Sequence, residues 1–253
     1  MTAELVHLVV QSGIATITLD SPANRNALSA QLRGELRNAL DRTADDDLVR
    51  VVVLDHTGPV FCAGMDLKEP GSHGVTEFPT ILEQIWTHPK PVVAKLSGPA
   101  RAGGIGLVAA ADIAVAAHGA TFAFTEVRIG LVPAVISVTV LPQLLPRAAH
   151  ELFLTGETFD AARAATIGLL TSAVPADELD AEVARYAGLL IQGAPEALAM
   201  TKQMLHRSPA PTLAEDFAAM LDLSAQRFVS PEGREGRRAF IEKRPPSWVV
   251  DNP

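Results

Sequence analysis

The residues best suited to chemistry lie in one stretch, between positions 92 and 131. An apolar run over 92–96 breaks at Ser97-Gly98-Pro99, and the small-residue segment that follows contains Gly103 and Gly104. If a helix begins there, its first N–H groups have no intrahelical partner and its dipole favours negative charge. Glycine also lets a ligand approach the backbone closely. The pattern predicts a site for a developing oxyanion, with close packing of helix on strand as an equal alternative.

One carboxylate follows this glycine segment. Glu126 lies in apolar sequence, at the end of the β-like run TFAFTE. A partly desolvated glutamate has a raised pKa and can transfer protons near neutral pH. The alternative is a structural salt bridge with nearby Arg128 or another base. Glu126 is therefore a candidate general acid/base.

A second glycine-bearing junction between a strand and a helix occurs at Gly64-Met65-Asp66. The backbone N–H of Met65 is a candidate for a second oxyanion donor. Asp66 is better explained as a side-chain cap of the following helix than as a catalytic group.

Several other site types do not fit the sequence. Neither the phosphate-loop pattern G-x-x-x-x-G-K-[ST] nor the dinucleotide pattern G-x-G-x-x-G is present. The seven histidines are scattered without H-E-x-x-H, so no metal site is predicted. No G-x-S-x-G elbow is present, although a Ser-His-Asp site built from distant residues stays open.

The elements that must position these residues alternate between strands and helices. Runs over 5–10 and 14–19 predict a hairpin, and Ser29 can cap a helix to about residue 43. The continuous apolar run around 51–54 favours a strand buried on both faces, as in a parallel sheet. The order predicts an α/β fold. The C-terminal third is helical, over 177–191, 196–206, 212–228 and 231–242.

Composition limits the possible partners. The 253 residues are 48% apolar and 20% charged, which is typical of a globular chain. The net charge of −8 argues against nucleic-acid binding, and no apolar run is long enough to span a bilayer. The start of the chain lacks the basic segment of a signal peptide, and the single Cys62 suits a reducing compartment, so we expect a cytoplasmic protein. A basic cluster near the C-terminus is either a solvated helix face or a contact for a phosphate-bearing ligand; it comprises Arg234, Arg237, Arg238, Lys243 and Arg244.

Together these motifs resemble the crotonase superfamily of enoyl-CoA hydratases and isomerases. The resemblance covers nearly the whole chain and is carried by ANRNALS, RVVVLDHTGPVFCAGMDL, PKPVVAKLSGPARAGGIGLVAAADIAVA, ATFAFTEVRIGLVP, LFLTGETFDAARAATIGLLTSAVP and EGRRAFIEKRPPSW. It implies a spiral of ββα units over residues 1–195 and a helical trimerisation region over 196–253. It also implies a homotrimer or a dimer of trimers.

The resemblance also assigns residues to the site. It implies an acyl-CoA ligand whose thioester oxygen accepts from the N–H groups of Met65 and Gly103, with Glu126 as acid/base. Coenzyme A is then part of the substrate, and no separate cofactor is expected. Further binding residues implied by motif position are Ala23, Arg25, Ala63, Asp66, Leu67 and Gly104, with Phe240 and Lys243 reaching the CoA of a neighbouring subunit.

One departure from the family pattern bears on the reaction. Hydratases of this family usually carry a first glutamate where this chain has Gly106, and Glu126 matches only the second. The usual glycine-rich turn that follows reads Pro133-Ala134-Val135-Ile136, which we expect to narrow the acyl pocket or exclude water. Three hypotheses follow: a hydratase-like lyase, a Δ3,Δ2-enoyl-CoA isomerase that uses Glu126 alone, and an acyl-CoA binding protein with little activity.

Overall fold

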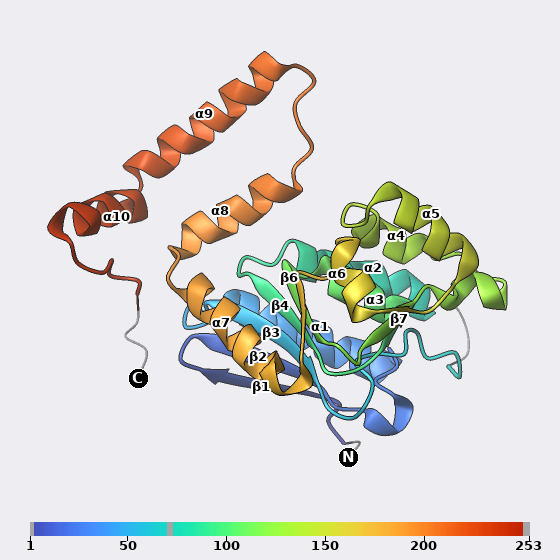
Figure 1. Ribbon diagram of the computed structural model, residues 1–253. Helices are drawn as coiled ribbons and strands as arrows, with labels where there is room; N and C mark the ends of the chain where they lie inside the picture. Colours follow the sequence, from blue (N-terminus) through green and yellow to red (C-terminus); the bar gives the residue numbers. More distant parts are fainter. Residues whose placement is uncertain (1–2, 70–72, 250–253) are drawn as a thin grey trace.

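The computed structural model describes residues 3–69 and 73–249 of the chain. Its main sheet has six strands in the order β1-β2-β3-β4-β6-β9 (Figure 1). β1 pairs antiparallel with β2, and every later pair in this sheet is parallel. The strands are β1 Val6–Gln11, β2 Ile14–Leu19, β3 Val51–His56, β4 Val92–Leu96, β6 Ile113–Ala117 and β9 Ser172–Val174. The predicted α/β class, hairpin and parallel strands are confirmed.

A second sheet of three short strands lies beside the first, in the order β5-β7-β8. Its strands are β5 Ala100–Arg101, β7 Thr121–Ala123 and β8 Phe159–Asp160. β5 pairs parallel with β7, and β7 pairs antiparallel with β8. The rings of Phe122 and Phe159 stack across β7 and β8 with their centroids 5.6 Å apart, which fixes this sheet on the core.

The remaining elements are helices and three 3-10 turns. They are η1 Pro22–Asn24, α1 Ala30–Asp45, α2 His73–Trp86, α3 Gly103–Ala110, η2 Thr125–Ile129, α4 Ala134–Val140, α5 Pro146–Thr155, α6 Ala161–Thr166, η3 Ala176–Glu178, α7 Leu179–Ile191, α8 Pro195–His206, α9 Leu213–Val229 and α10 Pro231–Glu242. The predicted cap is present, since the Ser29 side chain accepts from the N–H of Leu32.

Both faces of the main sheet are covered, which explains the continuous apolar sequence of β3. Val52 and Leu54 pack into the large core beneath α1, α2 and α3. Val51 and Val53 pack on the opposite face with Leu179 and the rest of the buried face of α7. Alternate residues of one strand therefore face two different helical layers, as expected for a parallel sheet.

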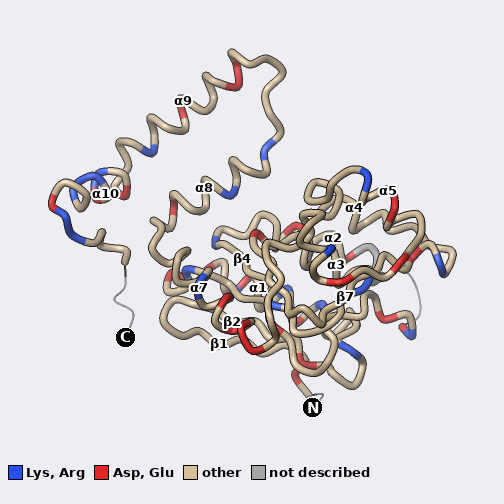
Figure 2. The backbone as a smooth tube through the Cα atoms, in the orientation of Figure 1, with Lys and Arg blue, Asp and Glu red and all other residues tan. Residues whose placement is uncertain are grey.

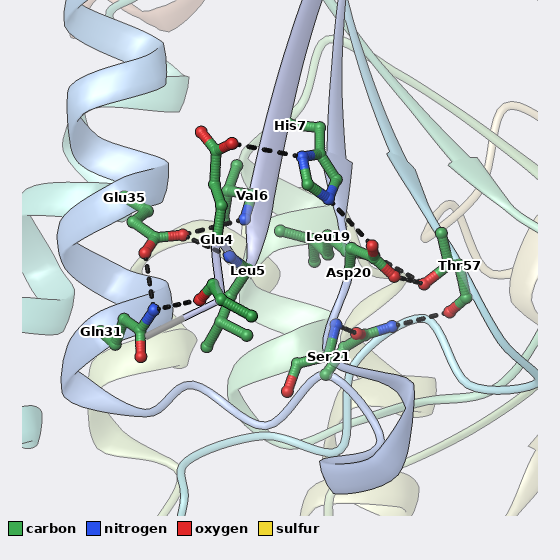
Figure 3. A network of polar contacts seen from close by, with 12 residues as sticks. Glu4, Leu5, Val6, His7, Leu19, Asp20, Ser21, Gln31, Glu35 and Thr57 are labelled. Carbon is green, nitrogen blue, oxygen red and sulfur yellow. Dashed lines mark hydrogen bonds and ion pairs between the residues drawn. The ribbon is translucent and has the colours of Figure 1, made fainter. Parts of the chain in front are cut away.

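The N-terminal strand is tied to α1 and to the end of β2 by a polar network (Figure 3). The carboxylate of Glu35 accepts from the backbone N–H groups of Leu5 and Val6 at 2.6 and 3.0 Å. Asp20 accepts from Thr57 and lies 2.9 Å from Nε2 of His7. This network fixes the start of the loop that carries Ala23 and Arg25 toward the site.

The C-terminal helices leave the sheets after α7 (Figure 1). α8 is anchored by Lys202, whose ammonium donates to Asp112 at 2.7 Å and to the carbonyl of Ile85 at 2.9 Å. α9 and α10 extend away from the α4 and α5 side of the molecule. No helix in the described ranges is long and apolar enough to cross a membrane.

Candidate active site

Strand pairing brings the glycine segment and Glu126 together. β5 and β7 run parallel, with Arg101 opposite Ala123. Gly103 follows two residues after Arg101 as the first residue of α3, and Glu126 follows three residues after Ala123 in η2. Because parallel strands end at the same edge of a sheet, both residues emerge side by side. Glu126 lies in a 3-10 turn after β7, whereas the sequence predicts it at the end of a strand.

The Gly64 turn completes the same corner. Cys62 forms a bridge with Ala100, and the N–H of Arg101 donates to the carbonyl of Cys62 at 3.0 Å. Gly64 has a φ of +91°, and a Cβ built there would lie 3.0 Å from the Cβ of Ala102 and 3.4 Å from the amide nitrogen of Gly103. Only glycine combines this φ with this approach, so Gly64 sets Met65 beside the start of α3.

Ala102 adopts an unusual backbone conformation directly before the candidate donor. Its φ and ψ are +46° and −118°, a region that alanine rarely occupies and that costs on the order of 1–3 kcal/mol. The N–H of Ala102 donates to the carbonyl of Ala123 at 3.3 Å, which holds this turn against β7. Such strain is concentrated at functional sites, where the surrounding fold over-determines the geometry.

The two residues with candidate donor groups line one cavity. Met65 and Gly103 both line a cavity of about 260 Å³ together with Glu126. Neither of the two N–H groups donates to any acceptor within the described part of the chain. As first residue of α3, Gly103 has no intrahelical partner for its N–H. The arrangement can therefore bind an oxygen that gains negative charge.

Glu126 is the ionisable side chain of this cavity. Among the described lining residues it alone carries a titratable group; the others are Ala63, Met65, Leu67, Phe78, Ala102, Gly103, Thr125, Ile129, Leu131, Val132, Pro133, Ala134, Val135 and Ile136. Its Oε2 atom is buried without a hydrogen-bond partner. Burial raises the pKa of Glu126 above the ordinary glutamate value of 4.5.

The position of the usual first glutamate is closed. Gly106 lies in α3, and a Cβ built on it would lie 2.8 Å from Cγ2 of Ile136 and 3.4 Å from Cδ2 of Leu82. Ile136 is only 3% exposed and also lines the cavity. The apolar Pro133-Ala134-Val135-Ile136 segment lines the same cavity as Glu126, and its effect on the width of the acyl pocket stays a prediction.

The residues expected along the CoA chain converge on the same corner. The N–H of Ala63 donates to the carbonyl of Arg25 at 3.0 Å, so the loop that includes Ala23 lies against the Gly64 turn. Asp66 accepts from the side chain of Asn24 at 2.8 Å and from the N–H of Lys68 at 3.0 Å. These hydrogen bonds lower the pKa of Asp66. The predicted helix cap is wrong, because Asp66 accepts from Lys68 within a short turn and the helix that follows, α2, begins only at His73.

Two further predicted residues flank this corner. A Cβ built on Gly104 would lie 2.6 Å from the carbonyl oxygen of Cys62, so glycine is needed for α3 to approach the turn. Leu67 lines the cavity and is 71% exposed. Their contact with CoA stays a prediction.

Phe240 and Lys243 lie elsewhere in the chain. Phe240 belongs to α10 and is 85% exposed, and Lys243 ends that helix with a φ of +55°. Neither lines the cavity of its own chain. The basic residues gather on and just after α10 (Figure 2). Arg238 and Arg244 form ion pairs there with Glu242. Contact of this helix with CoA in a neighbouring subunit stays a prediction.

Some cavity residues were not predicted from the sequence. Phe78 of α2 lines the cavity, and its ring lies 3.3 Å from a Cβ built on Gly103. The orientation of α2, which carries Phe78, depends on tertiary packing. The strained Ala102 shows no pattern in sequence, because positive φ is signalled mainly by glycine or asparagine.

No metal site accompanies this cavity. Within residues 3–69 and 73–249, no group of three or more His, Cys, Asp or Glu side chains could hold a metal ion. Cys62 is buried beneath the start of α3, and burial raises its pKa to about 12. A thiol in this state is a poor nucleophile.

Comparison with known proteins identifies the family of the chain. The model of the enoyl-CoA hydratase/isomerase family matches residues 9–250. The mitochondrial enoyl-CoA hydratase domain-containing protein 3 of Rattus norvegicus is 35% identical over 251 residues, covering 94% of this chain and 82% of the relative.

Solved structures give the same result. An enoyl-CoA hydratase from Mycobacterium smegmatis superposes with a TM-score of 0.91 at 32% identity, covering 97% of this chain and 99% of the other. An enoyl-CoA hydratase from Mycobacterium avium is 42% identical with a TM-score of 0.76, covering 98% and 100%. The crotonase-like fold with a helical C-terminal region is thereby confirmed, and the chain belongs to the enoyl-CoA hydratase/isomerase family of the crotonase superfamily.

Proposed function

We propose that the protein is an acyl-CoA enzyme that shifts a double bond by proton transfer, as a Δ3,Δ2-enoyl-CoA isomerase with Glu126 as its acid/base. The observation that carries this proposal is the lone carboxylate of the cavity. Glu126 has a buried, unpartnered Oε2 atom and lines the same cavity as Met65 and Gly103, whose N–H groups donate to no acceptor among the described residues. These are the parts needed to remove and return one proton next to a thioester.

The N–H groups of Met65 and Gly103 hold the thioester oxygen. The Glu126 carboxylate removes a proton from C2 of a 3-enoyl thioester, and the electron pair moves onto that oxygen to give a dienolate. Donors already fixed in place stabilise the new charge without reorganisation. Glu126 then returns the proton to C4, so the double bond lies between C2 and C3 and no atom is gained or lost.

The apolar wall favours this reaction over hydration. Adding water needs a group that holds and activates it, and the position where hydratases of the family carry the other carboxylate, their first glutamate, is Gly106 in this chain. Ile136 fills the space that a side chain at Gly106 would enter. A water at this wall would lack the two to four polar partners that an ordered buried water requires.

Hydration is the second candidate function. It is favoured by the names of the relatives, since the solved structures from Mycobacterium smegmatis and Mycobacterium avium are both called enoyl-CoA hydratases. In that case Glu126 alone would take a proton from water and deliver one to C2. A third possibility, a binding protein with little activity, is disfavoured by the buried carboxylate, whose desolvation is costly without a role. In each case CoA belongs to the ligand, and we expect no separate cofactor.

A pair of substrates distinguishes these reactions. The enzyme is incubated with a 3-enoyl-CoA and with crotonyl-CoA, and the absorbance of the conjugated thioester is followed. An isomerase increases this absorbance with the 3-enoyl substrate and leaves crotonyl-CoA unchanged. Loss of absorbance with crotonyl-CoA and no gain with the 3-enoyl substrate would establish hydration instead. No change with either substrate would leave binding alone.

The assembly is proposed to be a trimer or a dimer of trimers through residues 196–253. α9 carries exposed apolar side chains at a helical spacing that forms one stripe; they are Leu213, Phe217, Leu221 and Phe228. Such a stripe on a projecting helix needs a partner surface. Light scattering should give the mass of three or six chains of 26.7 kDa, and a mass of one chain would refute the assembly.

A further inference from the structure

The cavity is closed at its inner end. Ile136 lies in the first turn of α4, between the cavity and Gly106 of α3. One turn later, the single hydroxyl proton of buried Thr139 is shared between the carbonyl of Ile136 at 3.3 Å and that of Gly106 at 3.4 Å. The side chains of Ile136 and Thr139 thus pack α4 against α3. An acyl chain therefore has no space to continue between these two helices.

The cavity is open and apolar at its outer end. Ile129, Leu131 and Val132 all line the cavity, yet they are 56%, 50% and 78% exposed. We call these three residues the outer rim. They lie three to six residues after Glu126 in the chain, and the N–H of Leu131 donates to the carbonyl of Glu126 at 2.9 Å. Contiguous exposed apolar residues at the mouth of a cavity are typical of a ligand-binding groove.

We propose that the acyl chain beyond the reacting carbons leaves the cavity across the outer rim, so that the substrates are thioesters with apolar chains of medium length or longer. This inference rests on the proposed function, because that function places the thioester oxygen at Met65 and Gly103 and carbons C2 to C4 beside Glu126. From there the inner direction meets Ile136, and the outer direction follows apolar surface that is continuous with the cavity. Each added methylene then removes more of the outer rim from water.

Binding of saturated acyl-CoAs tests this route without any turnover. These ligands lack a double bond, so neither isomerisation nor hydration can consume them. Calorimetric titration with butanoyl-, hexanoyl-, octanoyl-, decanoyl- and dodecanoyl-CoA gives the change of Kd with chain length. Full burial of a methylene would lower Kd about 4-fold, and a half-exposed rim should give about 2-fold per methylene. A Kd that is lowest for butanoyl-CoA and rises with length would overturn the proposal.

Variants locate the effect on the molecule. The double variant Leu131→Ser/Val132→Ser should flatten the dependence of Kd on chain length. Val138→Ser is the matched control, because Val138 is 73% exposed on α4 but does not line the cavity; it should keep the full dependence. If Ile136→Ala strengthens binding of the longer acyl-CoAs, the acyl chain runs toward Ile136 and the proposal is wrong.

Two further measurements distinguish this inference from an interface between copies of the chain and from failure of the proposed function. Light scattering on the same variants tests whether the outer rim instead joins two copies of the chain. A changed mass with an unchanged chain-length dependence would overturn the proposal. The proposed function fails separately, if octanoyl-CoA binds tightly while the corresponding 3-enoyl-CoA is not converted.

Discussion

Glu126 and Arg128 lie two residues apart but do not pair. Nε of Arg128 donates to the carbonyl of Thr155 at 3.1 Å, whereas Oε2 of Glu126 is buried without a partner. The salt bridge that the sequence allowed between them is therefore absent. Since no cation compensates for the lost water, the protonated form of Glu126 is favoured and its pKa is raised. An acid/base group that must both take and give a proton benefits from this shift.

Replacing Glu126 tests its role as acid/base. Glu126→Gln keeps the shape of the side chain but cannot accept the proton, so kcat should fall on the order of 10²-fold or more. The steady-state rate with a 3-enoyl-CoA measures this loss. The control is Glu157→Gln, an exposed glutamate outside the cavity, which should keep the full rate. An unchanged rate for Glu126→Gln would remove Glu126 from the mechanism.

The raised pKa of Glu126 also predicts that the reaction rate and the stability of the fold change with pH in opposite directions. The rate should increase as pH rises through this pKa, because the base acts as a carboxylate. Stability should behave in the other way: a pKa above the unfolded value adds stability at low pH and loses it as pH rises through the folded pKa. The Tm of Glu126→Gln should therefore exceed that of the parent at pH 8. This difference in Tm should disappear below pH 4.5, the ordinary pKa of a glutamate. Thermal unfolding across pH checks both limits, and a gap that widens in acid would contradict this account.

Restoring the missing glutamate should require two substitutions. Gly106→Glu alone places Cβ 2.8 Å from Ile136 Cγ2, and this β-branched, buried side chain has little freedom to move. Overpacking of this kind costs about 1–3 kcal/mol. The double variant Gly106→Glu/Ile136→Gly should recover part of that loss and gain hydration of crotonyl-CoA.

Gly34 provides the control for this pair. It lies on an exposed position of α1, and a Cβ built there meets no atom within 4 Å. Gly34→Glu should therefore leave the free energy of unfolding unchanged or slightly increased, since glycine is a poor helix former. Denaturant unfolding compares the three variants. If Gly106→Glu is as stable as Gly34→Glu, the Ile136 side chain moves aside at little cost and the predicted overpacking is wrong.

The features that follow from local chemistry could be predicted from sequence. The Ser29 cap and the continuous apolar strand around 51–54 depend on residues close together in the chain. The sequence also indicated the glycine helix start and Glu126 individually, but the pairing of β5 with β7 brings them together. The glycine junction at 64–66 indicated Met65 as a candidate second donor, and the family resemblance then assigned that role to it. The structure then places Met65, Gly103 and Glu126 around one cavity.

The remaining features depend on contacts between distant segments. The two-residue strand β5 exists because Ala100 and Arg101 pair with β7, and no local pattern marks it. The strain at Ala102 is imposed by the packing of the Gly64 turn and by the bond to Ala123. The sequence did mark the apolar segment that includes Ile136, but only the structure shows that this side chain faces Gly106.

Cys62 should be unreactive in the folded protein. Burial raises its pKa to about 12, and the residue is fully buried beneath α3. Iodoacetamide at pH 8 should leave Cys62 unmodified in the native state and label it after unfolding in guanidinium. Mass spectrometry counts the label. Rapid labelling of the native protein, with loss of activity, would mean that the corner beneath Gly103 and Gly104 opens readily.

The ion pair between Lys202 and Asp112 should be the main interaction that holds α8 on the core. Nζ of Lys202 lies 2.7 Å from Oδ2 of Asp112, and the lysine is only 6% exposed. The same carboxylate oxygen accepts from the N–H of Val92 at 2.7 Å. Lys202→Met keeps most of the side-chain volume but leaves Asp112 without its cation, which should cost about 3 kcal/mol of unfolding free energy.

An exposed ion pair gives the matched control for Lys202. Arg163 and Glu151 lie 3.1 Å apart with about half of each side chain exposed, so Arg163→Met should cost no more than about 1 kcal/mol. Denaturant unfolding measures both values. Because Asp112 also bonds the backbone of β4, loss of Lys202 should loosen α8 first, and limited proteolysis should then cut between residues 191 and 213. Equal losses for the two variants would show that α8 is held by apolar packing instead of by this pair.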